Sequence, residues 1–138
     1  MTRKEFQQLA RVRLEEAKSL LSTGHFAGAY YLAGYVVECG LKACIAKKTK
    51  RFDFPPDRKT VEKVYSHDFD SLVSAAKLVE ELGKACKADK EFEDFWKLAN
   101  DWSEASRYEE SAEQDARKLL QAITDRKHGV LRWIRGFW

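Results

Sequence analysis

Every strong run of hydrophobic positions in this chain repeats with the spacing of an amphipathic helix. The first run predicts a helix over about residues 2–21, which Gly24 should end because glycine adopts the left-handed conformation found just past helix ends. The second run, over about residues 25–48, is the most apolar and predicts the central helix of the core.

Small residues crowd the predicted central helix and lower its intrinsic helix propensity. We expect the compensation to be close approach of a neighbouring backbone at these positions, which are Ala27, Gly28, Ala29, Ala33, Gly34 and Gly40.

The second half of the chain predicts shorter helices. Residues 49–66 hold both prolines among charged residues and predict the one long connection. Asp68 is a suitable N-cap for a helix over residues 68–83, and Asp89 for an aromatic-rich helix that reaches Trp102. A capping box of Ser111 and Gln114 opens the next helix, and Gly129 should break or bend it before the apolar residues 130–138.

These elements predict an all-α protein, an antiparallel up-and-down helical bundle of four to five helices forming one domain over residues 1–138. A chain of 138 residues is long enough to bury roughly two-thirds of its unfolded surface in one core. The longest apolar stretch, residues 27–39, is too short to span a bilayer, and the N-terminus lacks the apolar core of a signal peptide. We therefore expect a cytoplasmic protein with no membrane contact.

The cysteines and the absence of known catalytic motifs argue against several kinds of metal and nucleotide-hydrolysing site. The three cysteines form no Cys-x-x-Cys pair, which favours buried, reduced thiols over a metal site. No glutamate is followed by a histidine at the Glu-x-x-His spacing of di-iron bundles, and no glycine-rich phosphate loop is present. We therefore assign no catalytic residue, no cofactor and no metal.

Charge is distributed unevenly, although the net charge of +3 is small. Acidic residues dominate residues 80–115, whereas basic residues dominate residues 42–63 and the tail. Such patches can attract a polyanion, although solvated helix faces have the same composition. The candidate residues for nucleic-acid binding are Lys47, Lys48, Lys50, Arg51, Arg126, Lys127 and Arg132.

One polar cluster is predicted from the position of Glu38 on the apolar stripe of the central helix. A buried carboxylate needs a donor, and Arg107 could hold it through two parallel hydrogen bonds, with Tyr108 beside it. His67, at the start of a predicted helix, could join them. If the cluster opens to solvent it could hold a phosphate or a base edge, and if it is sealed it is a structural network.

The tail is unusually rich in large aromatics with arginine, a composition typical of interface anchors. Trp133, Phe137 and Trp138 therefore predict a homodimer interface, and the alternative is closure of the chain's own core.

The string GHFAGAYYLAGYVVECGLKA, residues 24–43, resembles the signature helix of the HEPN family, the higher eukaryote and prokaryote nucleotide-binding domains. The HDFDSL string at residues 67–72, the segment 102–108 with its Arg-Tyr pair, and the apolar tail resemble that family in order and spacing. The resemblance implies a bundle of four or five helices, commonly homodimeric, often encoded beside a minimal nucleotidyltransferase or acting in RNA-related defence.

Many members of that family cleave RNA with an arginine followed, after four to six residues, by a histidine. No arginine stands at this spacing before His25, His67 or His128. The leading hypothesis is therefore a non-catalytic module that binds a nucleotide or RNA, or pairs with a nucleotidyltransferase. The alternatives are a weak, metal-independent, toxin-type ribonuclease that uses His67 or His128 with Arg107 or Arg126, and a purely structural dimer partner.

Overall fold

A computed structural model describes residues 1–49, 58–103 and 113–138. Within these ranges the chain forms helices and no strand, which confirms the predicted all-α fold. The helices are more finely divided than the four to five predicted, with the bounds α1 (Arg3–Ser22), α2 (Phe26–Lys48), α3 (Arg58–Val64), α4 (Phe69–Ala75), α5 (Val79–Ala88), α6 (Lys90–Asn100), α7 (Glu113–Thr124) and α8 (Val130–Arg135).

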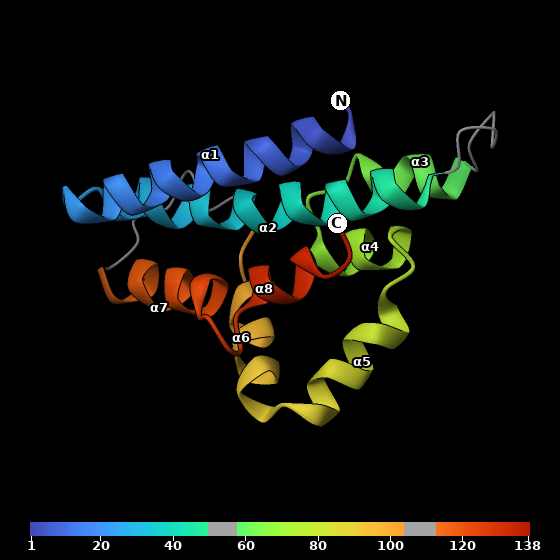
Figure 1. Cartoon of the computed structure of the whole chain (residues 1–138). Coiled ribbons are helices and arrows are strands. Elements are labelled where there is room, and N and C mark those ends of the chain that lie inside the picture. The colour runs from blue at the N-terminus through green and yellow to red at the C-terminus, as the bar shows by residue number, and fades with distance from the viewer. Residues whose placement is uncertain (50–57, 104–112) are drawn as a thin grey trace.

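The two longest helices, α1 and α2, lie antiparallel along one side of the molecule (Figure 1). A capping box starts α1, because the Thr2 hydroxyl accepts from the Glu5 amide at 3.2 Å and the Glu5 carboxylate accepts from the Thr2 amide at 2.6 Å. Gly24 follows α1 with a φ of +81°, as predicted. This turn sends α2 back along α1.

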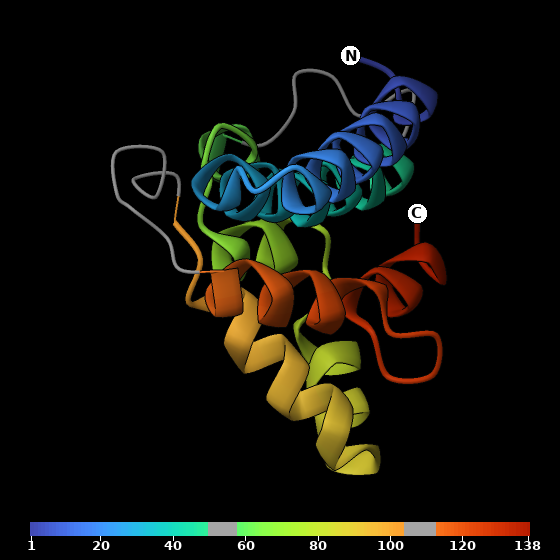
Figure 2. The same cartoon turned by 90° about the vertical axis from the view of Figure 1, so that its left-hand side faces the viewer.

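Helix α2 is the central helix, as its apolar sequence predicted. It contacts α1 on one side and α4, α7 and α8 on the other, an arrangement visible in Figures 1 and 2. Its buried residues run over most of its length, from Ala29 to Ile45. A polar side chain on α2 is therefore forced to find its partner inside the protein.

The glycines of α2 face neighbouring side chains and not the neighbouring backbone expected at these positions. A Cβ at Gly34 would stand 1.9 Å from Cε2 of Trp102, inside the indole ring. A Cβ at Gly40 would stand 3.0 Å from Cγ2 of Ile134. These glycines lower the helix propensity of α2, but they leave room for large side chains of later elements to pack against it.

Two predicted elements of the middle region differ from the structure. The predicted connection over residues 49–66 contains α3 within its described part. The predicted helix over residues 68–83 is interrupted at Lys77, which has a φ of 60°, and continues as α5 in another direction. The amide of Leu78 donates to the carbonyl of Val73 at 3.0 Å, which ends α4 and buries Leu78. Val79, the first residue of α5, is 61% exposed.

Helices α5 and α6 project away from the α1–α2 pair (Figure 1). Asp68 and Asp89 cap α4 and α6 as predicted, since their carboxylates accept backbone amides of the first helical turn. The aromatic face of α6 lies inward, with Phe92 and Trp96 buried. The predicted capping box at Ser111 involves a residue outside the described ranges.

Gly129 separates α7 from α8, so the chain breaks there and does not merely bend. A Cβ at this position would stand 2.3 Å from the carbonyl oxygen of Asp125. Only glycine fits such a close approach of backbone to backbone. The turn places α8 against α2 and turns its basic residues outward.

Candidate functional site

Glu38 of α2 is the one charged residue that the described part of the fold buries, with 2% of its surface exposed. The imidazole Nδ1 of His67 donates to its Oε1, and Lys42 Nζ lies 3.7 Å from the same oxygen. The predicted contact between Glu38 and His67 is therefore present. Two cationic or donor groups compensate the burial of this carboxylate.

Lys42 is the partner that sequence reasoning missed. It lies one helical turn after Glu38, a spacing that places the two side chains on the same helix face. Arg107 and Tyr108, the other predicted members of this cluster, lie outside the described residues, so their participation stays a prediction. The Glu38 carboxylate is sealed from solvent, whereas 38% of the His67 side chain and 18% of the Lys42 side chain are exposed.

Aromatic rings surround this polar pair. Tyr35 lies with its ring centroid 6.2 Å from the imidazole of His67 and 5.5 Å from Trp102, and Tyr31 lies 5.0 Å from Tyr35. Trp102 stacks on Phe69 at 5.5 Å with an interplanar angle of 6°. The rings fix the start of α4, and with it His67, against α2.

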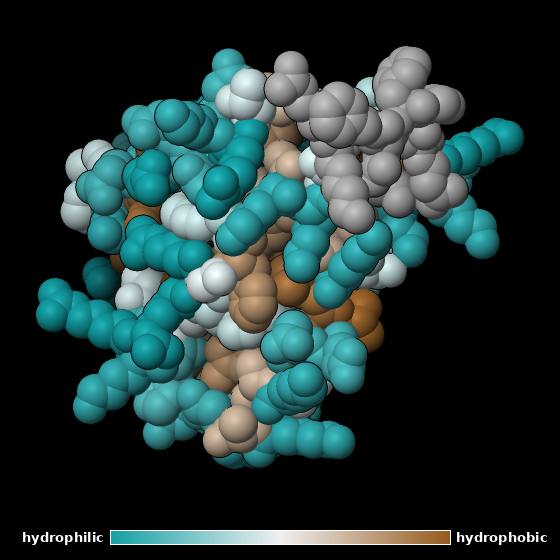
Figure 3. All heavy atoms as spheres, turned by 45° about the vertical axis from the view of Figure 1, so that its right-hand side comes forward, coloured by the Kyte–Doolittle hydropathy of each residue, from teal (hydrophilic) through white to brown (hydrophobic). Residues whose placement is uncertain are grey.

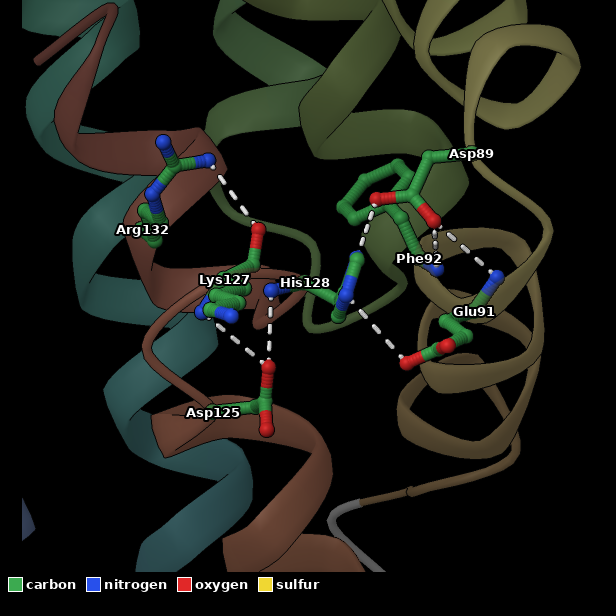
Figure 4. Close-up of polar contacts among 7 residues, drawn as sticks. All are labelled: Asp89, Glu91, Phe92, Asp125, Lys127, His128 and Arg132. Carbon is green, nitrogen blue, oxygen red and sulfur yellow. Dashed lines mark hydrogen bonds and ion pairs between the residues drawn. The ribbon is translucent and has the colours of Figure 1, made fainter.

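A second histidine cluster joins the α7–α8 turn to the start of α6 (Figure 4). His128 Nδ1 donates to Asp89 Oδ2 at 2.6 Å, and His128 Nε2 lies 3.3 Å from Glu91 Oε2. The turn itself is closed by Asp125, whose Oδ2 accepts the amides of Lys127 at 3.1 Å and His128 at 2.7 Å. Sequence reasoning named Asp89 as a cap but did not pair it with His128.

The contact with Asp89 changes the acidity of both groups. The hydrogen bond to Asp89 raises the pKa of His128, and the same bond lowers the pKa of Asp89. The charged form of His128 is therefore stabilised relative to that of a free histidine, and both ring nitrogens face carboxylates. This arrangement is that of an ion-paired clamp between α6 and the α7–α8 turn, since a histidine that transfers protons needs a ring nitrogen directed at substrate.

The basic residues predicted to bind nucleic acid fall into separate places. Lys47 and Lys48 lie at the end of α2, whereas Arg126 and Lys127 lie in the α7–α8 turn, well away from that end in Figure 1. Arg132 is on α8, and its Nη1 donates to the carbonyl of Lys127 at 3.1 Å. Lys50 and Arg51 lie outside the described residues. The predicted set is thus two surfaces, not one.

The tail aromatics pack on their own chain. Trp138 is 8% exposed, with the guanidinium carbons of Arg11 and Arg135 5.3 and 5.7 Å from its ring centroid. Its carbonyl oxygen accepts from Arg3 and, at 2.7 Å, from Gln7. Trp133 and Phe137 are half-buried, with their ring centroids 5.3 Å apart. These contacts are those of core closure, and the homodimer interface stays a prediction.

The cysteines are free thiols, and Cys39 and Cys44 are buried as predicted. Burial raises the pKa of Cys39 to about 11 and that of Cys44 to about 12, so both thiols stay protonated near neutral pH. Among the residues that the structure describes, no three histidine, cysteine or acidic side chains converge as metal ligands.

The described helices include none with the length and apolarity needed to cross a membrane. On the face drawn in Figure 3, hydrophilic side chains cover most of the surface and border a band of apolar ones.

The model of the HEPN domain matches residues 4–135, nearly the whole chain. No curated protein and no solved structure gives a significant match.

Proposed function

Because this chain belongs to the HEPN domain family, as residues 24–43 predicted, we propose that it is a non-catalytic member that binds a nucleotide or RNA. The observation that carries this proposal is that both ring nitrogens of His128 face carboxylates, those of Asp89 and Glu91. Metal-independent RNA cleavage needs a proton-transfer group at the 2′-hydroxyl and a cation on the phosphate.

The sequence supports the same conclusion, because no histidine follows an arginine at the spacing of the family's ribonucleases. Within the described residues, the ring contacts of His128 are with acidic side chains. A carboxylate beside the reacting phosphate would repel it, so such a site disfavours phosphodiester chemistry.

Binding is assigned to the basic side chains. The proposed contacts are Lys47, Lys48, Lys50, Arg51, Arg126, Lys127 and Arg132, which would contact phosphate groups. Such contacts release counterions, so the affinity for RNA should fall steeply as salt is added.

The test is incubation of the purified chain with a mixed pool of labelled RNA. We expect saturable, salt-sensitive binding and RNA of unchanged length on a denaturing gel. Cleavage that disappears in His67→Ala or His128→Ala would replace this proposal with the ribonuclease alternative.

Two partner proposals accompany this function. Pairing with a minimal nucleotidyltransferase is supported by family membership, and an adjacent reading frame of that kind, followed by co-purification, would test it. A homodimer through Trp133, Phe137 and Trp138 is supported by their aromatic composition. Sedimentation that finds only monomer at micromolar concentration would contradict the dimer.

A further inference from the structure

Four basic side chains from three different elements line one cavity beside α1, α7 and α8. The cavity has a volume of about 370 Å³. Lys18 comes from α1, Arg126 from the turn after α7, and Arg132 and Arg135 from α8. The apolar part of the lining is contributed by three buried residues of the same elements, Leu14, Ile123 and Leu131.

Three of the four cations of this cavity have no acidic partner among the residues that the structure describes. Among the described residues, no ion pair engages Arg126, Arg132 or Arg135. Lys18 pairs with Glu15 at 3.5 Å in an exposed position, where such a pair contributes little. The excess of positive charge is therefore available to an anion from solution.

The one carboxylate in the lining, that of Asp125, is already committed to the turn. Its Oδ2 accepts two backbone amides, those of Lys127 and His128. These hydrogen bonds offset part of its negative charge, so Asp125 weakens the field of the four cations without cancelling it.

Two of the arginines are held in place before any ligand arrives. Nη1 of Arg132 donates a hydrogen bond to the carbonyl oxygen of Lys127 at 3.1 Å, and the guanidinium of Arg135 lies over the ring of Trp138. A guanidinium has five N–H donors, so each keeps donors for a second acceptor. Arginines held in this way bind phosphate through parallel hydrogen bonds at a small entropic cost.

We propose that this cavity binds the phosphate group of a nucleotide, supplied either by a free nucleotide or by the 5′-end of an RNA. Its volume lies at the lower end of the roughly 300–1,000 Å³ typical of small-molecule sites, which suits one nucleotide and not a long strand. The inference rests on the proposed function and deepens it, because it selects Arg126 and Arg132 from the predicted basic residues and adds Lys18 and Arg135.

The experiment compares two double variants that remove the same charge. Arg126→Gln/Arg135→Gln empties the cavity of two cations, and Lys59→Gln/Lys77→Gln removes two exposed cations that belong neither to the cavity nor to the proposed contacts. ADP and inorganic phosphate are titrated into each full-length protein by calorimetry. We expect the cavity variant to lose about tenfold or more in ADP affinity, and the control variant to change by less than about twofold.

Lys18→Gln provides a second cavity variant on another helix, for the case in which the arginine pair fails to fold by circular dichroism. It should weaken ADP binding by about threefold.

RNA with a 5′-phosphate and the same RNA with a 5′-hydroxyl distinguish the two phosphate sources. A 5′-phosphate preference that the cavity variant loses identifies the RNA end, and ADP binding without that preference identifies a free nucleotide. A third double variant, Lys47→Gln/Lys48→Gln, removes two of the other proposed phosphate contacts. RNA binding lost only in this variant overturns the cavity and leaves the proposed function intact. ADP binding that is absent, or equal in the cavity variant and the control variant, also overturns the cavity. A loss of ADP affinity confined to the cavity variant, together with no RNA binding by the wild type, supports the cavity and restricts the proposed function to nucleotides.

Discussion

Two groups of charged side chains in this protein have opposite surroundings. Glu38 lies inside the bundle, and His67 and Lys42 compensate its charge. The cations around the α7–α8 turn face solvent, and three of them make no ion pair with a described carboxylate. Buried charge must be paired for the chain to fold, whereas unpaired surface charge costs the fold little and can attract a ligand. The first region should therefore control stability and the second should control binding.

The largest effect expected is that of Glu38→Gln. The substitution removes the buried carboxylate that His67 and Lys42 contact, and the free energy of unfolding should fall by about 3 kcal/mol. This value is at the low end for a broken buried pair because both partners reach solvent. Urea denaturation measures it. The control is Glu62→Gln in the exposed pair with Arg58, which should cost less than about 0.5 kcal/mol; equal losses would remove the distinction between the two regions.

Gly34→Ala tests the aromatic packing around the buried pair. Its Cβ would overlap the Trp102 ring, so we expect a loss of about 1–3 kcal/mol and altered near-ultraviolet circular dichroism. Gly83→Ala is the matched control, because nothing lies within 4 Å of its Cβ in α5. That change should stabilise the protein by about 0.5 kcal/mol. A neutral Gly34→Ala would show that the ring is not held against α2.

The His128 clamp should have a smaller, pH-dependent effect. The pKa of His128 is raised in the folded state. Its ion pairs therefore stabilise the fold fully at a pH below the pKa that His128 has in the unfolded chain, and this stabilisation is lost as the pH rises through the pKa of the folded state. The pKa of Asp89 is lowered in the folded state. Asp89 therefore stabilises the fold at a pH above the pKa that it has in the unfolded chain, and this stabilisation is lost as the pH falls through the pKa of the folded state.

The wild-type advantage over His128→Gln in urea denaturation should therefore shrink as pH rises from about 6 to about 8. An advantage that grows over this range would contradict the ion-paired clamp.

The smallest effect on stability should come from Arg126→Gln/Arg135→Gln. These exposed side chains have no described acidic partner, so the free energy of unfolding should change by less than about 0.5 kcal/mol. The same urea series measures it. A loss above about 1 kcal/mol would mean that these arginines support the fold and would weaken the contrast between the two regions.

The parts of the fold predicted from sequence are those with strong local signals. The periodicity of α1 and α2 and the stop at Gly24 are local properties of the chain, and all three were confirmed. The break at Lys77 was missed because lysine gives no turn signal, and the apolar spacing continues through it. The requirement for a small residue at Gly34 was recognised, but its partner Trp102 is fixed only by tertiary packing.

The candidate sites follow the same rule. The position of Glu38 on an apolar stripe predicted that its carboxylate needs a buried partner. His67, one of the donors proposed from the sequence, contacts it in the structure. The contact between His128 and Asp89 joins residues 39 positions apart and depends on where α6 meets the α7–α8 turn. Lys18 and Arg135 belong to the cavity only because α1 packs beside α7 and α8, which no local pattern encodes.

The most direct test of the whole account is one assay that reports binding and cleavage on the same samples. A labelled 5′-phosphorylated RNA is titrated with the wild type, with Arg126→Gln/Arg135→Gln and with the control variant Lys59→Gln/Lys77→Gln, and each sample is then run on a denaturing gel. We expect intact RNA throughout, wild-type binding that weakens with salt, and a loss of about tenfold in Arg126→Gln/Arg135→Gln that the control variant does not show. Shortened RNA in the wild-type lanes, or an affinity unchanged by salt and by both variants, would contradict the account.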